Sequence, residues 1–193
     1  MDNKASASSG EKILAAATRI AQAHGYGGLN LRTLAEEVGI KAASLYHHFP
    51  SKADLAAAVA RRYADDSVAT LEAIATEAGS PDACLRRYPE TFRRSLERDN
   101  RICLCSFMAA EYDDLPAEVQ AQIQVFADVN VAWLANVLQA GGIKREAAEL
   151  RGRAIFAAVS GAQLMARGRA DIALFDSIIE SYQAAGLLAS ANP

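Results

Sequence analysis

The sequence predicts an all-α protein of about nine helices. Signals for β-strands are nearly absent, whereas alanine-rich segments with apolar residues at helical spacing run along the chain. Short breaks that contain glycine, proline or aspartate separate these segments. The chain has 193 residues, 51% of them hydrophobic, which suits one large or two small domains with a sizeable core.

The expected helices form an N-terminal group of three, a long connecting helix and a C-terminal group. The connecting helix, 52–78, is long enough to link the two groups rigidly, and we find no internal repeat or flexible linker. Breaks at 79–82 and 113–116 each start a new helix, and Gly141 and Gly142 end one. If the breaks at 79–82 and 113–116 are counted with the helices that they start, the expected helices span about 11–24, 31–38, 42–49, 52–78, 79–98, 102–112, 113–140, 145–166 and 172–188.

The segment 30–52 has the pattern of two short helices joined by a tight turn. Leu31, Leu34, Ala35 and Val38 follow the spacing of a helix that is buried on one side. Gly39 comes directly after them, and glycine tolerates the left-handed backbone that ends a helix and turns the chain. The first helix of the pair is therefore expected to end at this glycine.

A second short helix follows at 42–49, with Leu45 and Phe49 facing the core. A proline ends it, and Ser51 is expected to cap the next helix, with Asp54 three residues later near its positive end. A helix, a glycine turn and a second helix make up the helix-turn-helix unit, in which the second helix enters the major groove of DNA.

These residues resemble the N-terminal domain of the tetracycline-repressor (TetR, AcrR-like) family of bacterial transcription regulators. The most specific match is the run LYHHFPSKADL at 45–55, and further matches lie at 13–17, 24–26, 31–35 and 38–40. They cover roughly the first third of the chain, and the rest is similar to the family only in its helical layout.

The resemblance implies two domains. A helix-turn-helix DNA-binding domain is expected at 7–67, with its motif at about 30–49. A helical domain for effector binding and dimerisation is expected at 68–193. No catalytic role, cofactor or metal is implied.

The charge distribution agrees with this division. The net charge of −3 by itself argues against binding to nucleic acid. Residues 1–62, however, hold eight Lys/Arg and five Asp/Glu, a net charge of +3, which leaves −6 for the remainder. A basic N-terminal region on an acidic body is typical of a DNA-binding module joined to a domain that does not bind DNA.

The second helix of the motif is only about two turns long, so its N-terminal end is expected to read the bases. Lys41, Ala42 and Ser44 lie there, while Tyr46 and His47 suit phosphate or thymine-methyl contacts. Where relatives often carry a Ser/Thr cap, a basic residue and a glycine, this chain has lysine and two alanines. The operator sequence therefore does not follow from these residues.

Contacts to the DNA backbone are expected from two further groups of residues. Arg32 and Thr33, in the first turn of the helix at 31–38, are placed to bind a phosphate at a helix N-terminus. The resemblance implies that Tyr46, His48 and Lys52 grip the backbone. A zinc site at the two adjacent histidines is disfavoured because neighbouring helical side chains point about 100° apart and no third ligand is near.

The last two expected helices have the composition of a dimer interface. Small residues recur at one-turn spacing in 145–166, and 172–188 carries a broad apolar stripe. Two such helices from each subunit would form a four-helix interface with twofold symmetry, although the same stripes could simply close the core of one subunit. The candidate interface residues are Ala158, Gly161, Ala162, Phe175, Ile178 and Tyr182.

The resemblance also implies a small-molecule pocket enclosed by the helices between 52 and 166. Pockets of this kind are mostly apolar with a few polar groups, so an apolar or aromatic effector is expected. Each candidate could equally be an ordinary core residue. The candidate lining residues are Phe92, Cys103, Phe107, Met108, Phe126, Trp133, Phe156 and Gln163.

Two of the three cysteines suggest a second form of regulation. Cys103 and Cys105 are expected near a helix start, after Arg98 and Arg101, where the helix end and the cations would lower the pKa of a thiol. Some relatives sense oxidants or electrophiles with a cysteine in this region. Buried cysteine is also a common small hydrophobic residue.

The location of the protein is expected to be cytoplasmic. No uninterrupted apolar run of about 18 residues exists, so we expect no membrane contact, and residues 1–12 read as a disordered leader without the hydrophobic core of a signal peptide. The cysteines would then be reduced thiols.

The sequence thus favours a homodimeric, ligand-responsive repressor that a small molecule releases from a palindromic operator on double-stranded DNA. Activation of transcription is not separable from repression by sequence. The alternatives are a thiol-based redox or electrophile sensor and a helical small-molecule-binding protein or enzyme. Catalysis is disfavoured because the chain shows no pair of nucleophile and base and no metal cluster.

Overall fold

A computed structural model describes residues 9–190, and in that range the chain is helical without β-strands. None of the helices described is long and apolar enough to cross a membrane. The elements are α1 (Ser9–His24), α2 (Leu31–Val38), α3 (Ala42–His48), α4 (Lys52–Ala78), α5 (Pro81–Arg87), α6 (Glu90–Glu97), α7 (Leu104–Ala109), the 3₁₀ helix η1 (Tyr112–Asp114), α8 (Ala117–Ala140), α9 (Arg145–Arg169) and α10 (Ile172–Ala184).

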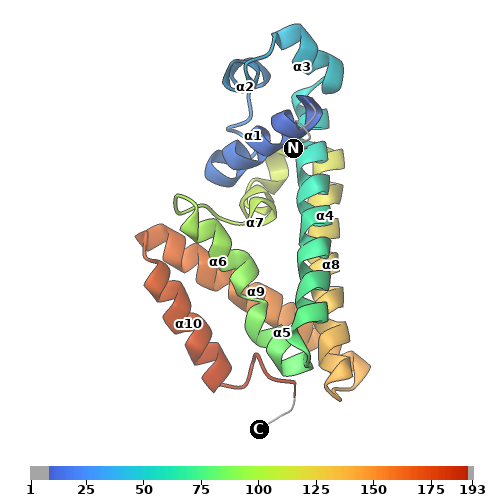
Figure 1. Cartoon of the computed structure of the whole chain (residues 1–193), viewed down its shortest axis with the longest axis vertical. Coiled ribbons are helices and arrows are strands. Elements are labelled where there is room, and N and C mark those ends of the chain that lie inside the picture. Colours follow the sequence, from blue (N-terminus) through green and yellow to red (C-terminus); the bar gives the residue numbers. More distant parts are fainter. Residues whose placement is uncertain (1–8, 191–193) are drawn as a thin grey trace, which may run out of the picture.

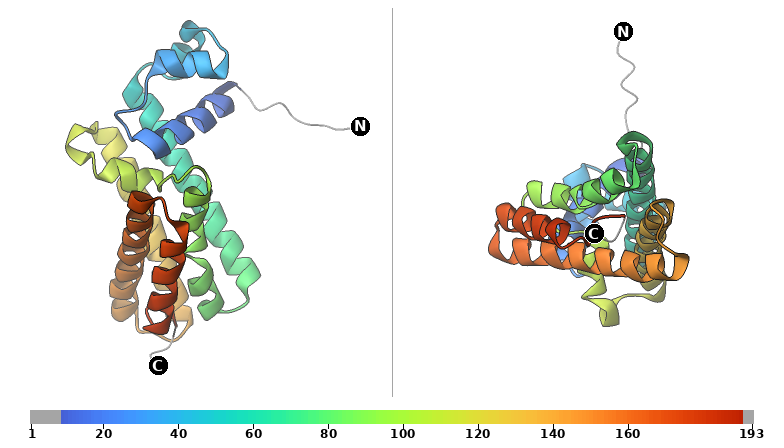
Figure 2. Two further views of the ribbon diagram at one scale, coloured as in Figure 1. Left: turned by 90° about the vertical axis from the view of Figure 1, so that its left-hand side faces the viewer. Right: turned by 90° about the horizontal axis from the view of Figure 1, so that it is seen from below.

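The helices are arranged as a small head on a longer body (Figure 1). Helices α1 to α3 form the head, and α4 runs from the head along the body beside α8. Helices α9 and α10 pack against each other on the side of the body away from α4, as the two views in Figure 2 also show. The all-α class predicted from the sequence is confirmed.

The helix-turn-helix forms for the reasons that its residues suggest. The Asn30 side chain caps α2 by accepting hydrogen bonds from two backbone N–H groups, and Gly39 ends that helix at φ 74°, in the left-handed region. Leu34, Leu45 and Leu55 are fully buried between the three head helices and the start of α4. The Ser51 hydroxyl accepts a hydrogen bond from the Asp54 N–H, so the predicted cap of α4 is confirmed.

One predicted helix is divided in two. The sequence pattern indicated a continuous helix from 79–82 to 98, but α5 ends at Arg87 and α6 begins at Glu90. Pro89 lies between them, and it has no N–H with which to continue the hydrogen-bond ladder. The break is short, because Tyr88 and Pro89 both keep right-handed helical backbone.

The other helix boundaries differ from the prediction by a few residues. Helix α1 begins at Ser9, so the C-terminal part of the predicted leader is helical, and residues 1–8 lie outside the described range. Helix α10 ends at Ala184 rather than 188. The loop after α6 holds Asp99 and Asn100 at φ 59° and 53°, in a left-handed conformation that few residues other than glycine adopt.

Candidate DNA-binding surface and ligand cavity

The outer face of α3 carries the side chains predicted to meet DNA. Leu45 is fully buried and fixes the inner side of this short helix. Tyr46, which is 50% exposed, and both His47 and His48 lie on the open side. Lys41 and Ser44 are likewise exposed, and Ala42 is half-buried at the start of the helix.

A groove beside α3 gathers the predicted phosphate-binding residues. It has a volume of about 550 Å³, and the start of α2, Tyr46 and Lys52 line it. The backbone N–H groups of Arg32 and Thr33 donate to Asn30 Oδ1 at 3.0 and 3.1 Å. These two amides are therefore already satisfied, and any phosphate contact there would come from the exposed side chains, which corrects the expectation of an open helix end.

Lys52 is held in place at the edge of this groove. Its ammonium group donates to the Gly27 carbonyl at 3.3 Å and lies 4.3 Å from the centre of the Tyr26 ring. The cation is thus fixed between the end of α1 and the start of α4, close to Arg32 and Tyr46. In the part of the chain that the structure covers, no three His, Cys, Asp or Glu side chains come together as a metal site.

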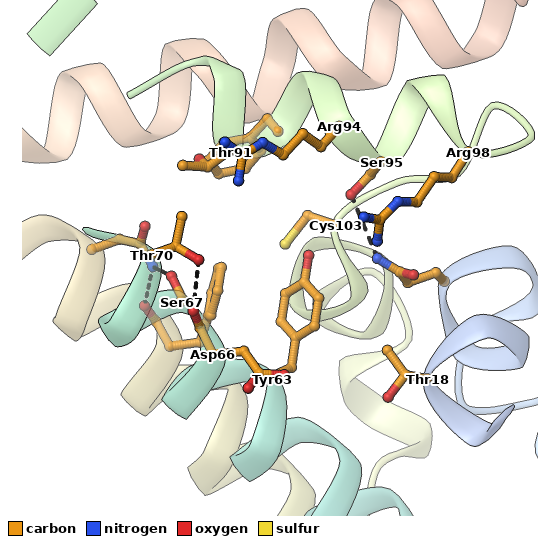
Figure 3. Close-up of a pocket in the computed structure, with 14 residues that line it drawn as sticks. Thr18, Tyr63, Asp66, Ser67, Thr70, Thr91, Arg94, Ser95, Arg98 and Cys103 are labelled. Atoms are coloured by element: carbon orange, nitrogen blue, oxygen red, sulfur yellow. Dashed lines mark hydrogen bonds between the residues drawn. The ribbon is translucent and has the colours of Figure 1, made fainter. Parts of the chain in front are cut away.

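A cavity of about 270 Å³ lies where the head meets the body (Figure 3). Helices α1, α4, α6 and α8 surround it, together with the loop after α6. Its lining residues are Thr18, Gln22, Tyr63, Asp66, Ser67, Thr70, Thr91, Phe92, Arg94, Ser95, Arg98, Cys103, Phe126 and Asn130.

A buried hydrogen-bond network supports the wall of this cavity. The Asn130 side chain is 1% exposed, and its oxygen accepts from the Tyr88 hydroxyl at 3.1 Å. Its amide nitrogen donates to the Ser67 hydroxyl at 3.3 Å and to the Phe126 carbonyl at 2.9 Å. The network joins α4, α8 and the residue that ends α5, so it fixes the spacing of three elements around the cavity.

The thiol of Cys103 lies inside the cavity, where Tyr63 points toward it (Figure 3). Burial raises the pKa of Cys103, and burial, followed by the nearby Cys103, raises the pKa of Cys105 well above its usual value. The predicted lowering of these pKa values is wrong, because loss of water dominates both shifts and raises the two pKa values.

A second hollow of about 560 Å³ lies on the other side of Phe126. It is an apolar groove between α7, α8 and α9, and Cys105, Phe107 and Phe156 line it. Its α9 wall combines the small residues Ala157, Ser160 and Gly161 with Phe156, the exposed Leu164 and Arg167. The two cysteines therefore face two different hollows.

The comparisons with known proteins agree with this geometry. A family model described as "Bacterial regulatory proteins, tetR family" matches residues 13–59, which contain the helix-turn-helix. The whole fold is similar to that of a TetR transcriptional regulator from Legionella pneumophila, with a TM-score of 0.88 and 27% identity over 93% of this chain and 97% of that one. The motif at 13–59 and the fold of the whole chain are thus those of TetR-family regulators.

Other solved structures share the TetR fold over nearly their whole length. A TetR-family transcriptional regulator from Agrobacterium tumefaciens is 27% identical with a TM-score of 0.81, covering 92% of this chain and 96% of that chain. The reduced form of E. coli NemR is 20% identical with a TM-score of 0.79, covering 92% and 96%, and shows the fold alone. No curated protein sequence matches significantly.

The predicted pocket residues divide into three groups. Phe92, Cys103 and Phe126 line the cavity, whereas Phe107, Phe126 and Phe156 line the apolar groove. Met108, Trp133 and Gln163 line neither hollow.

These last three residues have structural positions, which corrects their assignment to the pocket. Met108 and Gln163 are fully buried. The Gln163 side chain accepts from the Cys103 N–H at 2.9 Å and donates to the Phe92 carbonyl at 2.6 Å, so it ties α9 to α6 and α7. Trp133 stacks on Tyr88 with ring centres 5.9 Å apart.

Sequence reasoning missed the charged and head-derived lining of the cavity. Arg94 and Arg98 lie on its α6 side, and Thr18 and Gln22 come from the DNA-binding head. The only signal in the sequence was the four-residue spacing of the two arginines, which any exposed helix face could show. The cavity is more polar than the apolar pocket that we expected.

The predicted dimer residues are only partly available to a partner. Ala162 and Phe175 are each 1% exposed and belong to the core of the subunit, which corrects their assignment to an interface. Gly161 is exposed, and Ala158, Ile178 and Tyr182 are half-buried. The largest exposed apolar side chains on this face of α9 are Leu150, Leu164 and Met165.

Proposed function

We propose that the protein is a homodimeric repressor that binds a palindromic operator and that a small molecule in the cavity releases it. The observation that carries this proposal is the composition of the cavity wall. Thr18 and Gln22 of the head lie in the same wall as residues of α4, the helix that leads out of the DNA-binding motif. A bound molecule would therefore touch the head directly.

Several contacts would transmit such binding to α1. Gln22 Nε2 lies 3.5 Å from the Ser95 hydroxyl on α6. The Glu111 carboxylate, after α7, accepts hydrogen bonds from the Tyr26 and Gly27 N–H groups at 2.6 and 3.1 Å. A ligand that wedges α1, α4 and α6 apart would change the tilt of the head, and a coupling of ~1–3 kcal/mol changes affinity about 5–150-fold.

Dimerisation is proposed through α9 and α10. The face of α9 that bears Leu150, Ala157, Gly161 and Leu164 is exposed in the single subunit, and small residues in it permit close approach of a second helix. A twofold four-helix interface would place two α3 helices on successive turns of a palindromic operator. The oligomeric state is testable by sedimentation at several protein concentrations.

The repressor proposal is tested by combining DNA binding with ligand screening. Binding of the purified protein to the DNA upstream of its own gene would be followed by fluorescence anisotropy, and compounds would be added to the complex. The proposal predicts compounds that lower the affinity for the operator, and a cavity-filling Ser67→Phe variant that lowers it without any compound. A matched Thr76→Phe change on the exposed side of α4 serves as the control. If compounds released the operator equally well from both variants, the assignment of the effector site to this cavity would be wrong.

A thiol-based sensor is the second candidate. It is favoured by the position of the Cys103 thiol in the cavity, next to the Tyr63 hydroxyl. The raised pKa of this thiol argues against it, because the thiolate is the reactive form. Loss of operator binding on treatment with an electrophile, abolished by Cys103→Ser, would favour this candidate over reversible ligand binding.

A further inference from the structure

We infer that the cavity between head and body takes a small organic carboxylate with an aromatic or other apolar body. The inference rests on the proposed effector role of this cavity and adds the chemical class of the effector. The carboxylate would bind at the α6 side of the cavity, on Arg94 and Arg98, and the apolar body would lie against the rings on the other walls.

The arginines of α6 divide into one that is neutralised and two that are not. Arg93 binds Asp176 of α10 through two hydrogen bonds of 2.7 and 2.9 Å and also pairs with Glu97. Arg94 and Arg98, one helical turn apart, line the cavity, and neither forms an ion pair with any residue that the structure describes. Figure 3 shows both along the α6 side of the cavity.

The one carboxylate in the lining is already paired. Asp66, on α4, accepts a hydrogen bond from Arg62 Nε at 2.9 Å, and Arg62 also contacts Glu11 at 2.9 Å. No carboxylate of the lining is therefore left to neutralise Arg94 and Arg98 on the opposite side of the cavity. A guanidinium binds a carboxylate with two parallel hydrogen bonds, and such charge-assisted bonds are roughly twice as strong as neutral ones.

The other walls suit an apolar body with few polar groups. Phe92 and Phe126 are buried in the wall, and Tyr63 lies 5.4 Å from Phe126 between ring centres. Thr70 and Thr91 add hydroxyl groups at the side. The volume of about 270 Å³ is just below the ~300–1,000 Å³ of sites for drug-sized ligands, so the ligand is small.

Matched acids and amides test this inference on the full-length protein. The probes are benzoate with benzamide, phenylacetate with phenylacetamide, 2-naphthoate with 2-naphthamide, and hexanoate with hexanamide. Binding is measured by calorimetry and by the fluorescence of Trp133, the single tryptophan, which stacks on the Tyr88 of the cavity network. At least one acid should bind, with its amide at least tenfold weaker and with an affinity that falls at high salt.

Substitution of the two arginines tests whether they bind the carboxylate. Arg94→Gln and Arg98→Gln together should weaken the bound acid at least tenfold, whereas Arg169→Gln, at an exposed arginine at the end of α9, should leave its affinity unchanged. Circular dichroism and thermal unfolding confirm that each variant is folded. The inference is overturned if no acid binds at millimolar concentration, if amides bind as well as acids, or if the double variant binds the acid like the wild type.

A separate measurement distinguishes this inference from the repressor proposal. If an acid binds through the two arginines but leaves the affinity for operator DNA unchanged, the ligand class holds and the effector role of the cavity fails. If a neutral compound releases the operator while no acid binds, the effector role holds and the ligand class fails.

Discussion

Arg167, at the end of α9, donates a hydrogen bond to the carbonyl oxygen of Ala23, near the end of α1, at 3.2 Å. The same guanidinium donates to the Asn100 carbonyl at 2.6 Å, and the Asn100 side chain donates back to the Arg167 carbonyl at 3.0 Å. One side chain thus joins the head, the left-handed loop after α6 and the body. This junction borders both hollows, because Arg167 lines the apolar groove and the loop lies between Arg98 and Cys103.

Removal of this junction should loosen the head. Arg167→Gln leaves the Ala23 and Asn100 carbonyls without their charged donor, and we expect the free energy of unfolding to fall by about 1–3 kcal/mol. The coupling between ligand and operator binding should fall with it. Urea unfolding at fixed protein concentration measures the first effect, and Arg169→Gln is the control. Equal stability of the two variants would contradict the role given to Arg167.

The Glu111 carboxylate should stabilise the turn that follows α1. Glu111→Gln retains one acceptor oxygen for the two N–H groups of Tyr26 and Gly27 and loses the negative charge, so we expect a loss of about 1–2 kcal/mol. Asp113→Asn changes an exposed carboxylate in the same segment and should have little effect. Thermal unfolding of the two variants gives the comparison, and an undisturbed Glu111→Gln protein would show that the contact is dispensable.

The Asn130 network should contribute to stability more than an exposed asparagine of the same helix. Asn130→Leu leaves the buried Tyr88 hydroxyl without its acceptor, which costs about 1–3 kcal/mol. Asn136→Leu, on the exposed side of α8, should change the free energy of unfolding by less than about 0.5 kcal/mol. Denaturant titrations of both variants check the difference, and equal costs would mean that the network is not structurally important.

The buried thiols should react slowly at neutral pH. Burial raises the pKa of Cys103 and Cys105, so the folded protein holds fewer thiolates at pH 7 to 8 than the unfolded chain. For the same reason the free energy of unfolding should fall as the pH rises above the ordinary thiol pKa of ~8.5, because the folded state then binds more protons. A chromogenic disulfide reagent, with guanidinium-unfolded protein as reference, measures the rates. One fast thiol in the folded protein would restore the sensor hypothesis.

The sequence was most informative where local chemistry decides the structure. The turn at Gly39 and the cap at Ser51 follow from backbone and side-chain preferences, and both were predicted. The break at Pro89 was also readable from the missing N–H, but the helical spacing on both sides concealed it.

Features that depend on packing between distant segments could not be predicted in this way. Phe175 and Ile178 belong to the same apolar stripe in the sequence, yet Phe175 is 1% exposed in the core while Ile178 is half-buried. The cavity combines α1 with α6, and only the fold brings Gln22 within 3.5 Å of Ser95. The assignments of single residues to DNA and effector remain predictions.

The predicted DNA contacts can be tested one at a time. Lys52→Gln should weaken operator binding and reduce the slope of log affinity against log salt by about 1, because one phosphate contact is lost. Tyr46→Ala should weaken binding as well, since its exposed ring lies beside the groove at the start of α2. Lys144→Gln, an exposed lysine before α9 in the body, is the control for charge. If Lys52→Gln and Tyr46→Ala both bind like the wild type, the assignment of the groove is wrong.

Binding of the full-length protein to the DNA upstream of its own gene, against a scrambled duplex and over a series of salt concentrations, tests the central claim most directly. The regulator assignment predicts saturable binding, protection of a palindromic site and a steep decrease in affinity with salt. Weak binding that does not distinguish the two duplexes, and that Tyr46→Ala and Lys52→Gln leave unchanged, would contradict it.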